Sequence, residues 1–361
     1  MIKIYDMETL EEREILFRGG SGADVSAPVA EILRAVQERG DAALREYTLR
    51  FDGAAPDALA VTAEEVDQAA AQVEPAFLAV LEEAAEHIRA YHARQKRESF
   101  VMTEREGVVL GQRIIPLARV GIYVPGGTAA YPSTVLMNAI PARIAGVGEI
   151  IMVTPPGRDG AVNPHILAAA KIAGVTRIYK VGGAQAIAAL AFGTESIPKV
   201  DKIVGPGNAY VAAAKRLVSG DVGIDMVAGP SEVCVLADAS ADPVVVAADL
   251  MAQAEHDPMA SCYLVTCDEA LPERVLEAVE TLVAQSPREG ITRTSLDERG
   301  VIVVCETPDA AVDAVNVIAP EHLELHCGDA MALLGRVRNA GAIFVGPWSS
   351  EPLGDYVAGP N

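Results

Sequence analysis

Apolar and polar positions recur along the chain with two different periods. In residues 27–51 and 74–95, apolar side chains return at spacings of three and four, which is typical of amphipathic helices. From Val108 onward, short apolar runs of strand length alternate with helical stretches of about ten to fifteen residues. This alternation predicts parallel sheets joined by right-handed crossovers, and therefore an α/β fold.

The apolar runs form two series, with boundaries near Tyr123 and Ser231. The 361 residues, half of them apolar, are enough for two domains that each bury a core. We expect an N-terminal helical segment over residues 1–20, a first α/β domain made of residues 21–122 plus 232–361, and a second α/β domain made of residues 123–231.

Charge and composition narrow the class of protein. The formal net charge is −21, so most of the surface repels nucleic acid, and no nucleic-acid partner is expected. No run reaches the roughly 18–20 apolar residues of a membrane helix, and the N-terminus lacks the apolar stretch of a signal peptide. Five scattered cysteines do not suggest a disulfide framework, which favours a cytoplasmic protein. No membrane partner is expected.

Three glycine-rich turns follow strands of the first series. They are "VPGG" from Val124, "VGGAQ" from Val181 and "GPGN" from Gly205. Glycine lets a backbone approach a phosphate, and the helix that follows offers free N–H groups. None of the turns completes G-x-G-x-x-G, since Tyr210 stands at the third glycine position of the last one. Together they favour a nucleotide or another phosphate ligand, although plain turns explain each one alone.

The stretch "MAQAEHDP" belongs to a predicted helix with an unusual polar face. Asp242 and Pro243 are a typical helix start, and the apolar pattern continues to His256. Asp249, Gln253 and His256 then fall at i, i+4 and i+7 on one face. Such a face lines a cleft or finds partners inside the protein. A histidine one turn from an oxygen donor is half of a zinc site, and an inert hydrogen-bonded pair is the alternative.

A second polar concentration is "APEHLELHC". Glu321 and His322 follow Pro320 and could carry protons with separate tasks. His322 and His326 could instead be a metal pair on a helix. If the segment is a strand, His322, Glu324 and His326 share a face. A surface strand or helix edge is the alternative without chemistry.

Read together, these segments closely resemble the histidinol dehydrogenase family. The matching motifs occur in the family's order and cover nearly the whole chain. They are "GIYVPGG", "VGGAQAIAALAFGTESIPKVDKIVGPGN", "AGPSEV", "AQAEHDP", "IAPEHLEL" and "GDYVAGPN". The resemblance implies two incomplete Rossmann-like domains with parallel sheets, similar to those of aldehyde dehydrogenases, plus N-terminal helices. It also implies a homodimer.

The resemblance further implies a reaction and a set of site residues. L-histidinol becomes L-histidine through the aldehyde, with two NAD⁺ and one zinc ion per site, as the last step of histidine biosynthesis. The first domain is expected to carry the zinc and catalytic residues, and the second the NAD contacts. The implied residues are Gln253, His256 and Asp355 for zinc; Glu321 and His322 for acid/base catalysis; Ser231 with Gln253, His256, His322 and Asp355 for the substrate; and Tyr123, Gln185 and Asn208 for NAD.

The family also implies a segment after Asn361 that supplies a further zinc-binding histidine and a substrate-binding glutamate to the neighbouring subunit. In the expected mechanism His322 takes the alcohol proton and Glu321 activates water, without a covalent thiol. Two alternatives are a related zinc- and NAD-dependent dehydrogenase of another small alcohol, and an inactive, truncated dimerisation module.

Overall fold

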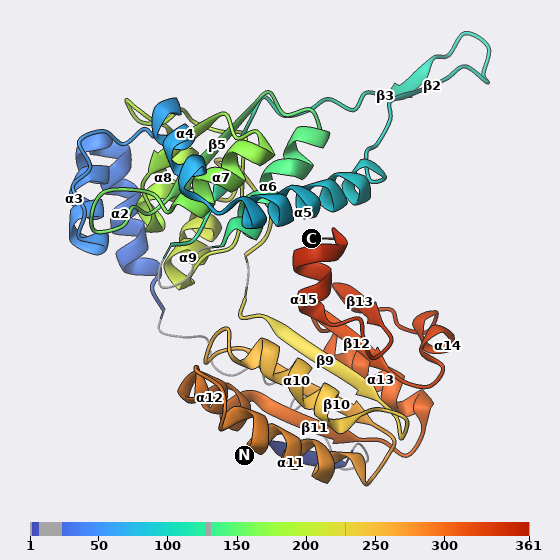
Figure 1. Ribbon diagram of the computed structural model, residues 1–361. Coiled ribbons are helices and arrows are strands. Elements are labelled where there is room, and N and C mark those ends of the chain that lie inside the picture. The colour runs from blue at the N-terminus through green and yellow to red at the C-terminus, as the bar shows by residue number, and fades with distance from the viewer. Residues whose placement is uncertain (1, 7–23, 127–130, 228, 361) are drawn as a thin grey trace. The chain divides into compact units, whose positions relative to one another are not determined.

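The computed structural model describes residues 2–6, 24–126, 131–227 and 229–360, apart from the side chain of Asp355. Contacts divide the chain into two compact units (Figure 1). One contains residues 1–21 and 229–354, and the other contains residues 22–228 and 355–361. Each unit has a parallel sheet covered by helices, which confirms the predicted α/β class.

The first unit is built on a six-stranded parallel sheet with the order β1-β11-β10-β9-β12-β13. Every residue of β9 and β10 is buried, as expected for parallel strands with helices on both faces. The strands are β1 (Lys3–Asp6), β9 (Glu232–Ala237), β10 (Ser261–Thr266), β11 (Gly300–Val304), β12 (His322–His326) and β13 (Ala342–Val345). The helices are α10 (Pro243–Ala254), α11 (Leu271–Val283), α12 (Glu289–Arg299), α13 (Pro308–Ile318), α14 (Ala330–Leu334) and α15 (Glu351–Leu353).

The second unit has a five-stranded parallel sheet with the order β6-β5-β4-β7-β8, and a separate hairpin of β2 and β3. Helices α2, α3, α8 and α9 share one core with this sheet, and α4 to α7 share the other. The strands are β2 (Phe100–Met102), β3 (Leu110–Gln112), β4 (Arg119–Tyr123), β5 (Glu149–Thr154), β6 (Arg177–Lys180), β7 (Lys202–Val204) and β8 (Gly223–Ile224). The helices are α2 (Ser26–Arg39), α3 (Asp41–Asp52), α4 (Ala63–Gln72), α5 (Pro75–Ala93), α6 (Pro132–Ile144), α7 (Pro164–Ala173), α8 (Gly183–Phe192) and α9 (Ala209–Val218).

The division of the chain differs from the expected one in two places. Residues 355–361 belong with the second unit, whereas they were expected in the domain that contains residues 232–354. Residues 22–122 belong with residues 123–228, not with 232–361, because the apolar faces of α2 to α5 pack on the five-stranded sheet. Lys3–Asp6 is a strand that pairs with β11, whereas a helical segment was expected there. The rest of that segment, residues 7–20, lies outside the described residues.

None of the described helices combines the length and the apolar character that crossing a bilayer requires. The longest of them, α5, has 19 residues and carries Glu82, Glu83, Glu86 and Arg89 along its sequence.

Candidate functional site

The C-terminal turn of α10 and the start of β12 bring an amide and an imidazole together in the first unit. Helix α10 begins as predicted, since the Asp242 carboxylate accepts a hydrogen bond from the Val244 N–H. Near its end, Gln253 is buried, with 3 % of its surface exposed. Its Oε1 lies 3.4 Å from Nδ1 of His322, the first residue of β12. The two side chains therefore share one small region.

His256 does not continue the polar face of α10, contrary to the sequence prediction. The helix ends at Ala254, and His256 follows in a turn where its N–H donates to the Gln253 carbonyl, 3.2 Å away. The next residues explain the stop, because Pro258 disfavours helical backbone at Asp257. Asp249 and Gln253 thus share a buried helical face, whereas His256 is exposed beyond it.

Glu321 and His322 lie at the start of strand β12. His322 and His326 are both on this strand, so they are not a metal pair on a helix. Helix α13 ends at Ala319, whose φ of 48° turns the chain towards β12. The Glu321 carboxylate accepts from the Glu232 N–H at 3.4 Å, next to Ser231. His322 is half-buried and Glu321 is exposed, so both side chains are open to solvent at least in part.

All these groups gather at the amino edge of the six-stranded sheet. His322 pairs with Val233 in β9 and with Ala342 in β13, near the start of each strand. Gln253 lies at the end of the helix that leads into β10. Ligand sites of open parallel sheets normally lie at the carboxyl edge. This unit therefore places its predicted catalytic residues at the opposite edge.

A buried cluster lies next along β12, made of residues outside the predicted catalytic and metal-binding sets. Glu324 and His326 point to the same face as His322 and meet Asp249 of α10. Nε2 of His326 lies 3.3 Å from Asp249 Oδ2 and 3.6 Å from Glu324 Oε2. One ligand atom from each of the three residues lies within 4.8 Å of the others, close enough to surround a cation. Two signals in the sequence could have found this cluster. Glu324 and His326 follow His322 at the alternate positions of a strand, and Asp249 stands one helical turn before Gln253.

Burial controls protonation in this cluster. Burial raises the pKa of Asp249 to about 6, and burial together with the Asp249 charge raises the pKa of Glu324 to about 9. Burial also lowers the pKa of His326. Glu324 is therefore a protonated acid at neutral pH, beside an uncharged imidazole.

A Glu324→Gln variant is expected to flatten the pH dependence of stability. Because Glu324 has a higher pKa in the folded protein than its ordinary 4.5, folding binds a proton and the free energy of unfolding falls between pH 4.5 and about 9. The fall is expected to exceed roughly 2 kcal/mol between pH 5 and 8, since one pKa unit corresponds to about 1.4 kcal/mol. Urea unfolding at both pH values measures it. The control is Glu280→Gln, at an exposed ion pair. If the free energy of unfolding of Glu324→Gln depends on pH as steeply as that of the wild type, the expectation is contradicted.

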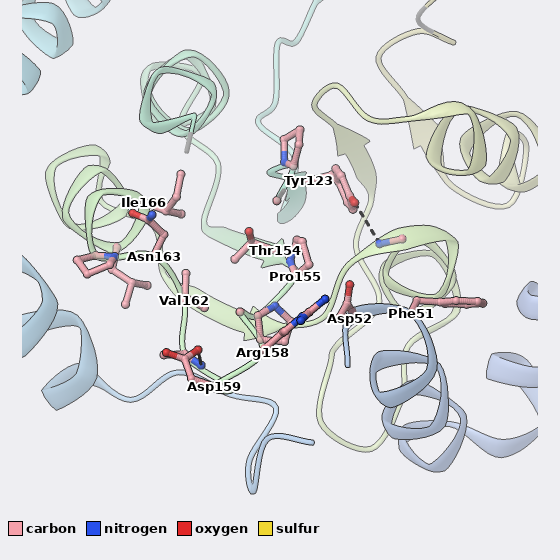
Figure 2. Close-up of a pocket in the computed structure, with 18 of the residues that line it drawn as sticks. Phe51, Asp52, Tyr123, Thr154, Pro155, Arg158, Asp159, Val162, Asn163 and Ile166 are labelled. Atoms are coloured by element: carbon pink, nitrogen blue, oxygen red, sulfur yellow. Dashed lines mark hydrogen bonds between the residues drawn. The ribbon is translucent and has the colours of Figure 1, made fainter. Parts of the chain in front are cut away.

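The predicted NAD contacts lie in the second unit, around a cavity of roughly 1350 Å³ (Figure 2). Tyr123, Gln185 and Asn208 all line it. The described parts of the three glycine-rich turns follow β4, β6 and β7, at the carboxyl edge of the sheet. The prediction that they share an edge is confirmed, while Gly127 lies outside the described residues.

Local hydrogen bonds fix two of these side chains and leave the third open. The Tyr123 hydroxyl accepts from the Gly183 N–H at 3.0 Å (Figure 2). Asn208 Oδ1 caps α9 by accepting from the N–H groups of Tyr210 and Val211, which leaves its amide group to donate. Gln185 is 1 % exposed, and neither its oxygen nor its nitrogen has a partner among the described residues. A buried amide without partners requires a ligand or water.

Comparison with known proteins identifies the family. The model of the histidinol dehydrogenase family matches residues 18–361. The chain belongs to the histidinol dehydrogenase family. A histidinol dehydrogenase from Geobacillus kaustophilus is 56 % identical over 92 % of this chain and 78 % of its own length. One from Listeria monocytogenes is 50 % identical over 98 % of this chain and 83 % of its own length.

A solved structure supports the same assignment at the level of the fold. The histidinol dehydrogenase from Elizabethkingia anophelis superimposes with a TM-score of 0.96 at 39 % identity. The match covers 100 % of this chain and 84 % of that one. Membership of the histidinol dehydrogenase family makes the chain an oxidoreductase with a place in histidine biosynthesis.

The remaining metal ligand implied by the family is Asp355. Its backbone belongs to the π-helical turn Gly354–Ala358, and the second unit begins within this turn, at Asp355. The Val357 carbonyl lies 2.6 Å from Nδ1 of His87 in α5. The side chain of Asp355 lies outside the described residues. The zinc set of Gln253, His256 and Asp355 therefore stays a prediction.

Proposed function

We propose that this member of the histidinol dehydrogenase family oxidises L-histidinol to L-histidine through the aldehyde, with two NAD⁺. The observation that carries the proposal is the placement of Glu321, His322 and Gln253 at one sheet edge, with 3.4 Å between the last two side chains. An imidazole and a carboxylate side by side can serve the two proton transfers that such an oxidation needs.

Zinc fits the residues present. Gln253 has a buried amide oxygen that Nδ1 of His322 approaches to 3.4 Å, and His256 offers an exposed imidazole in the next turn. An amide oxygen and an imidazole are donors of the kind that zinc accepts, and Asp355 is the further ligand that the family resemblance implies. Bound there, zinc would hold the substrate and favour the deprotonated form of its alcohol.

The side chains of this chain then have separate tasks. Because Nδ1 of His322 faces the Gln253 oxygen, its Nε2 is free to take the proton of the substrate hydroxyl. Glu321, exposed one residue earlier, would remove a proton from the water that adds to the aldehyde. His322 would take the proton of the resulting hydrate, and Ser231 at the start of β9 would contact the substrate. NAD would accept a hydride in each oxidation, with Tyr123, Gln185 and Asn208 as its contacts.

A thiol route is disfavoured by the environment of the cysteines. Cys234 and Cys262 are buried in the cores on either side of the six-stranded sheet. Burial raises the pKa of both thiols, that of Cys262 to about 12. A buried, protonated thiol is a poor nucleophile.

A homodimer and a reducing compartment complete the proposal. The hairpin β2–β3 of the second unit exposes apolar side chains, with Val101 71 % and Val109 72 % exposed, and a second copy of the chain is the proposed occupant. All five cysteines are free, which supports the cytoplasm as the location.

The test measures zinc content and NADH production together. The purified protein is expected to reduce NAD⁺ with L-histidinol, to lose this activity with a chelator and to regain it with zinc. His256→Ala is expected to lose zinc, whereas His326→Ala, at the buried cluster, is expected to keep it. NADH production with another amino alcohol but not with histidinol would favour the alternative dehydrogenase. Dimers without zinc or activity would favour a dimerisation module.

A further inference from the structure

We propose that Asp52 accepts hydrogen bonds from the ribose hydroxyls of a dinucleotide and so makes the cavity of the second unit select NAD over NADP. This inference rests on the proposed role of that cavity in NAD binding. Asp52 belongs to α3 and lies outside the three glycine-rich turns.

Asp52 is the last residue of α3 and lines the same cavity as Tyr123 and Gln185 (Figure 2). Its Oδ2 is buried and has no hydrogen-bond partner among the described residues. Burial raises the pKa of the Asp52 carboxyl to about 6. The pKa of Tyr123 is also raised, mainly by burial and to a smaller extent by the Asp52 charge. Asp52 as a whole is half-buried, but a carboxylate oxygen that is buried without a partner is costly unless a ligand supplies the missing donor.

The other acidic side chains that line the cavity are already engaged. Glu65 accepts from the Thr62 N–H at 2.8 Å and pairs with Lys180. Asp159 accepts from the Ala161 N–H at 3.0 Å. Of the described carboxylates around the cavity, Asp52 is thus the one with a buried oxygen left open.

A ribose diol matches this open carboxylate. In Rossmann-type sheets an acidic residue after the second strand accepts the 2′-hydroxyl of NAD, and a 2′-phosphate would be repelled there. The corresponding strand here, β5, ends at Thr154, and Pro155 and Pro156 follow it. The first acid after them, Asp159, already accepts from the Ala161 N–H. Helix α3 supplies the carboxylate from another direction.

A cation that lines the same cavity sharpens the expected effect of removing the Asp52 charge. Arg158, on the loop after β5, is exposed and lines the cavity together with Asp52 (Figure 2). With the Asp52 carboxylate neutralised, the cavity wall carries one negative charge fewer while the guanidinium of Arg158 stays. Arginine is a strong partner for phosphate. Loss of the Asp52 charge should therefore favour a dinucleotide that carries a 2′-phosphate.

The experiment measures binding rather than turnover. NADH and NADPH are titrated calorimetrically into the full chain and into the Asp52→Asn and Asp67→Asn variants. The wild type is expected to bind NADH more tightly than NADPH. Asp52→Asn is expected to weaken NADH binding about ten- to a hundredfold, as for loss of a charged hydrogen bond, and to bring the two affinities together or reverse their order. Asp67→Asn, at an exposed aspartate of α4 that is not among the residues lining the cavity, should change neither affinity.

Equal NADH affinity in Asp52→Asn and Asp67→Asn would overturn the inference while leaving the NAD cavity intact. Wild-type protein that binds neither dinucleotide would overturn the proposed NAD site, and the inference with it. Thermal unfolding of each variant separates these outcomes from misfolding. Asn at position 52 keeps the shape and removes a desolvated charge, so the melting temperature should not fall. A third variant, Asp52→Ser, must show the same shift towards NADPH.

Discussion

Replacing Glu321 with Gln should cripple the second oxidation of the proposed reaction far more than the first. The amide cannot take a proton from water, and loss of a general base typically costs about 10²–10⁴-fold in rate. The alcohol step uses His322 instead and should fall by less than about tenfold on the same scale. Stopped-flow NADH formation, started once from L-histidinol and once from the aldehyde, measures the two steps separately.

The control for Glu321→Gln is Glu306→Gln, an exposed glutamate that follows β11 in the same unit. It should leave both steps unchanged, whereas His322→Asn should slow both. Equal losses in the two steps of Glu321→Gln would show that Glu321 and His322 do not divide the proton transfers as proposed.

A Lys215→Met variant should destabilise the second unit by roughly 3 kcal/mol, because it leaves a largely buried carboxylate without its cation. The value lies at the lower end of the range for buried ion pairs, since Asp225 keeps 28 % of its side chain exposed while Lys215 keeps 2 %. The same variant should weaken NADH binding. Urea unfolding and NADH titration measure the two effects.

Geometry explains why this ion pair matters to the proposed NAD site. The ammonium group of Lys215 pairs with Asp225 and donates to the Gly205 carbonyl at 2.9 Å. Asp225 Oδ2 accepts from the Gly205 N–H at 2.8 Å. Both polar groups of Gly205 are thereby held, at a φ of 111° and with no room for a Cβ beside the Tyr123 carbonyl. The pair fixes the turn that presents Asn208.

Lys171→Met provides the comparison for Lys215→Met. It breaks an exposed pair with Asp67 and should cost under about 1 kcal/mol, without any change in NADH binding. If the two lysine variants lose the same stability and keep the same NADH affinity, the pair of Lys215 and Asp225 does not organise the turn.

Much of the local structure follows from short-range rules. Asp242 and Pro243 predict the start of α10, and the side chain of Asp242 caps the helix as expected. The alternation in "HLELH" allowed a strand, and β12 has His322, Glu324 and His326 on one face. The predicted end of α10 was two residues too late. Pro258 disfavours helical backbone at Asp257, and this effect outweighs the apolar pattern of a helix.

The sequence by itself determined the α/β class and the family and supplied the candidate residues of the two proposed sites, because hydrophobic period and motif order are local properties of the chain. Tertiary packing alone decided the rest. It assigned residues 22–122 to the five-stranded sheet, placed Glu321 and His322 at an amino edge, and brought Asp249 against His326. It also aimed Asp52 at the cavity. These contacts join residues far apart in the chain, and burial then shifts their pKa values and leaves polar atoms open, which no spacing rule encodes.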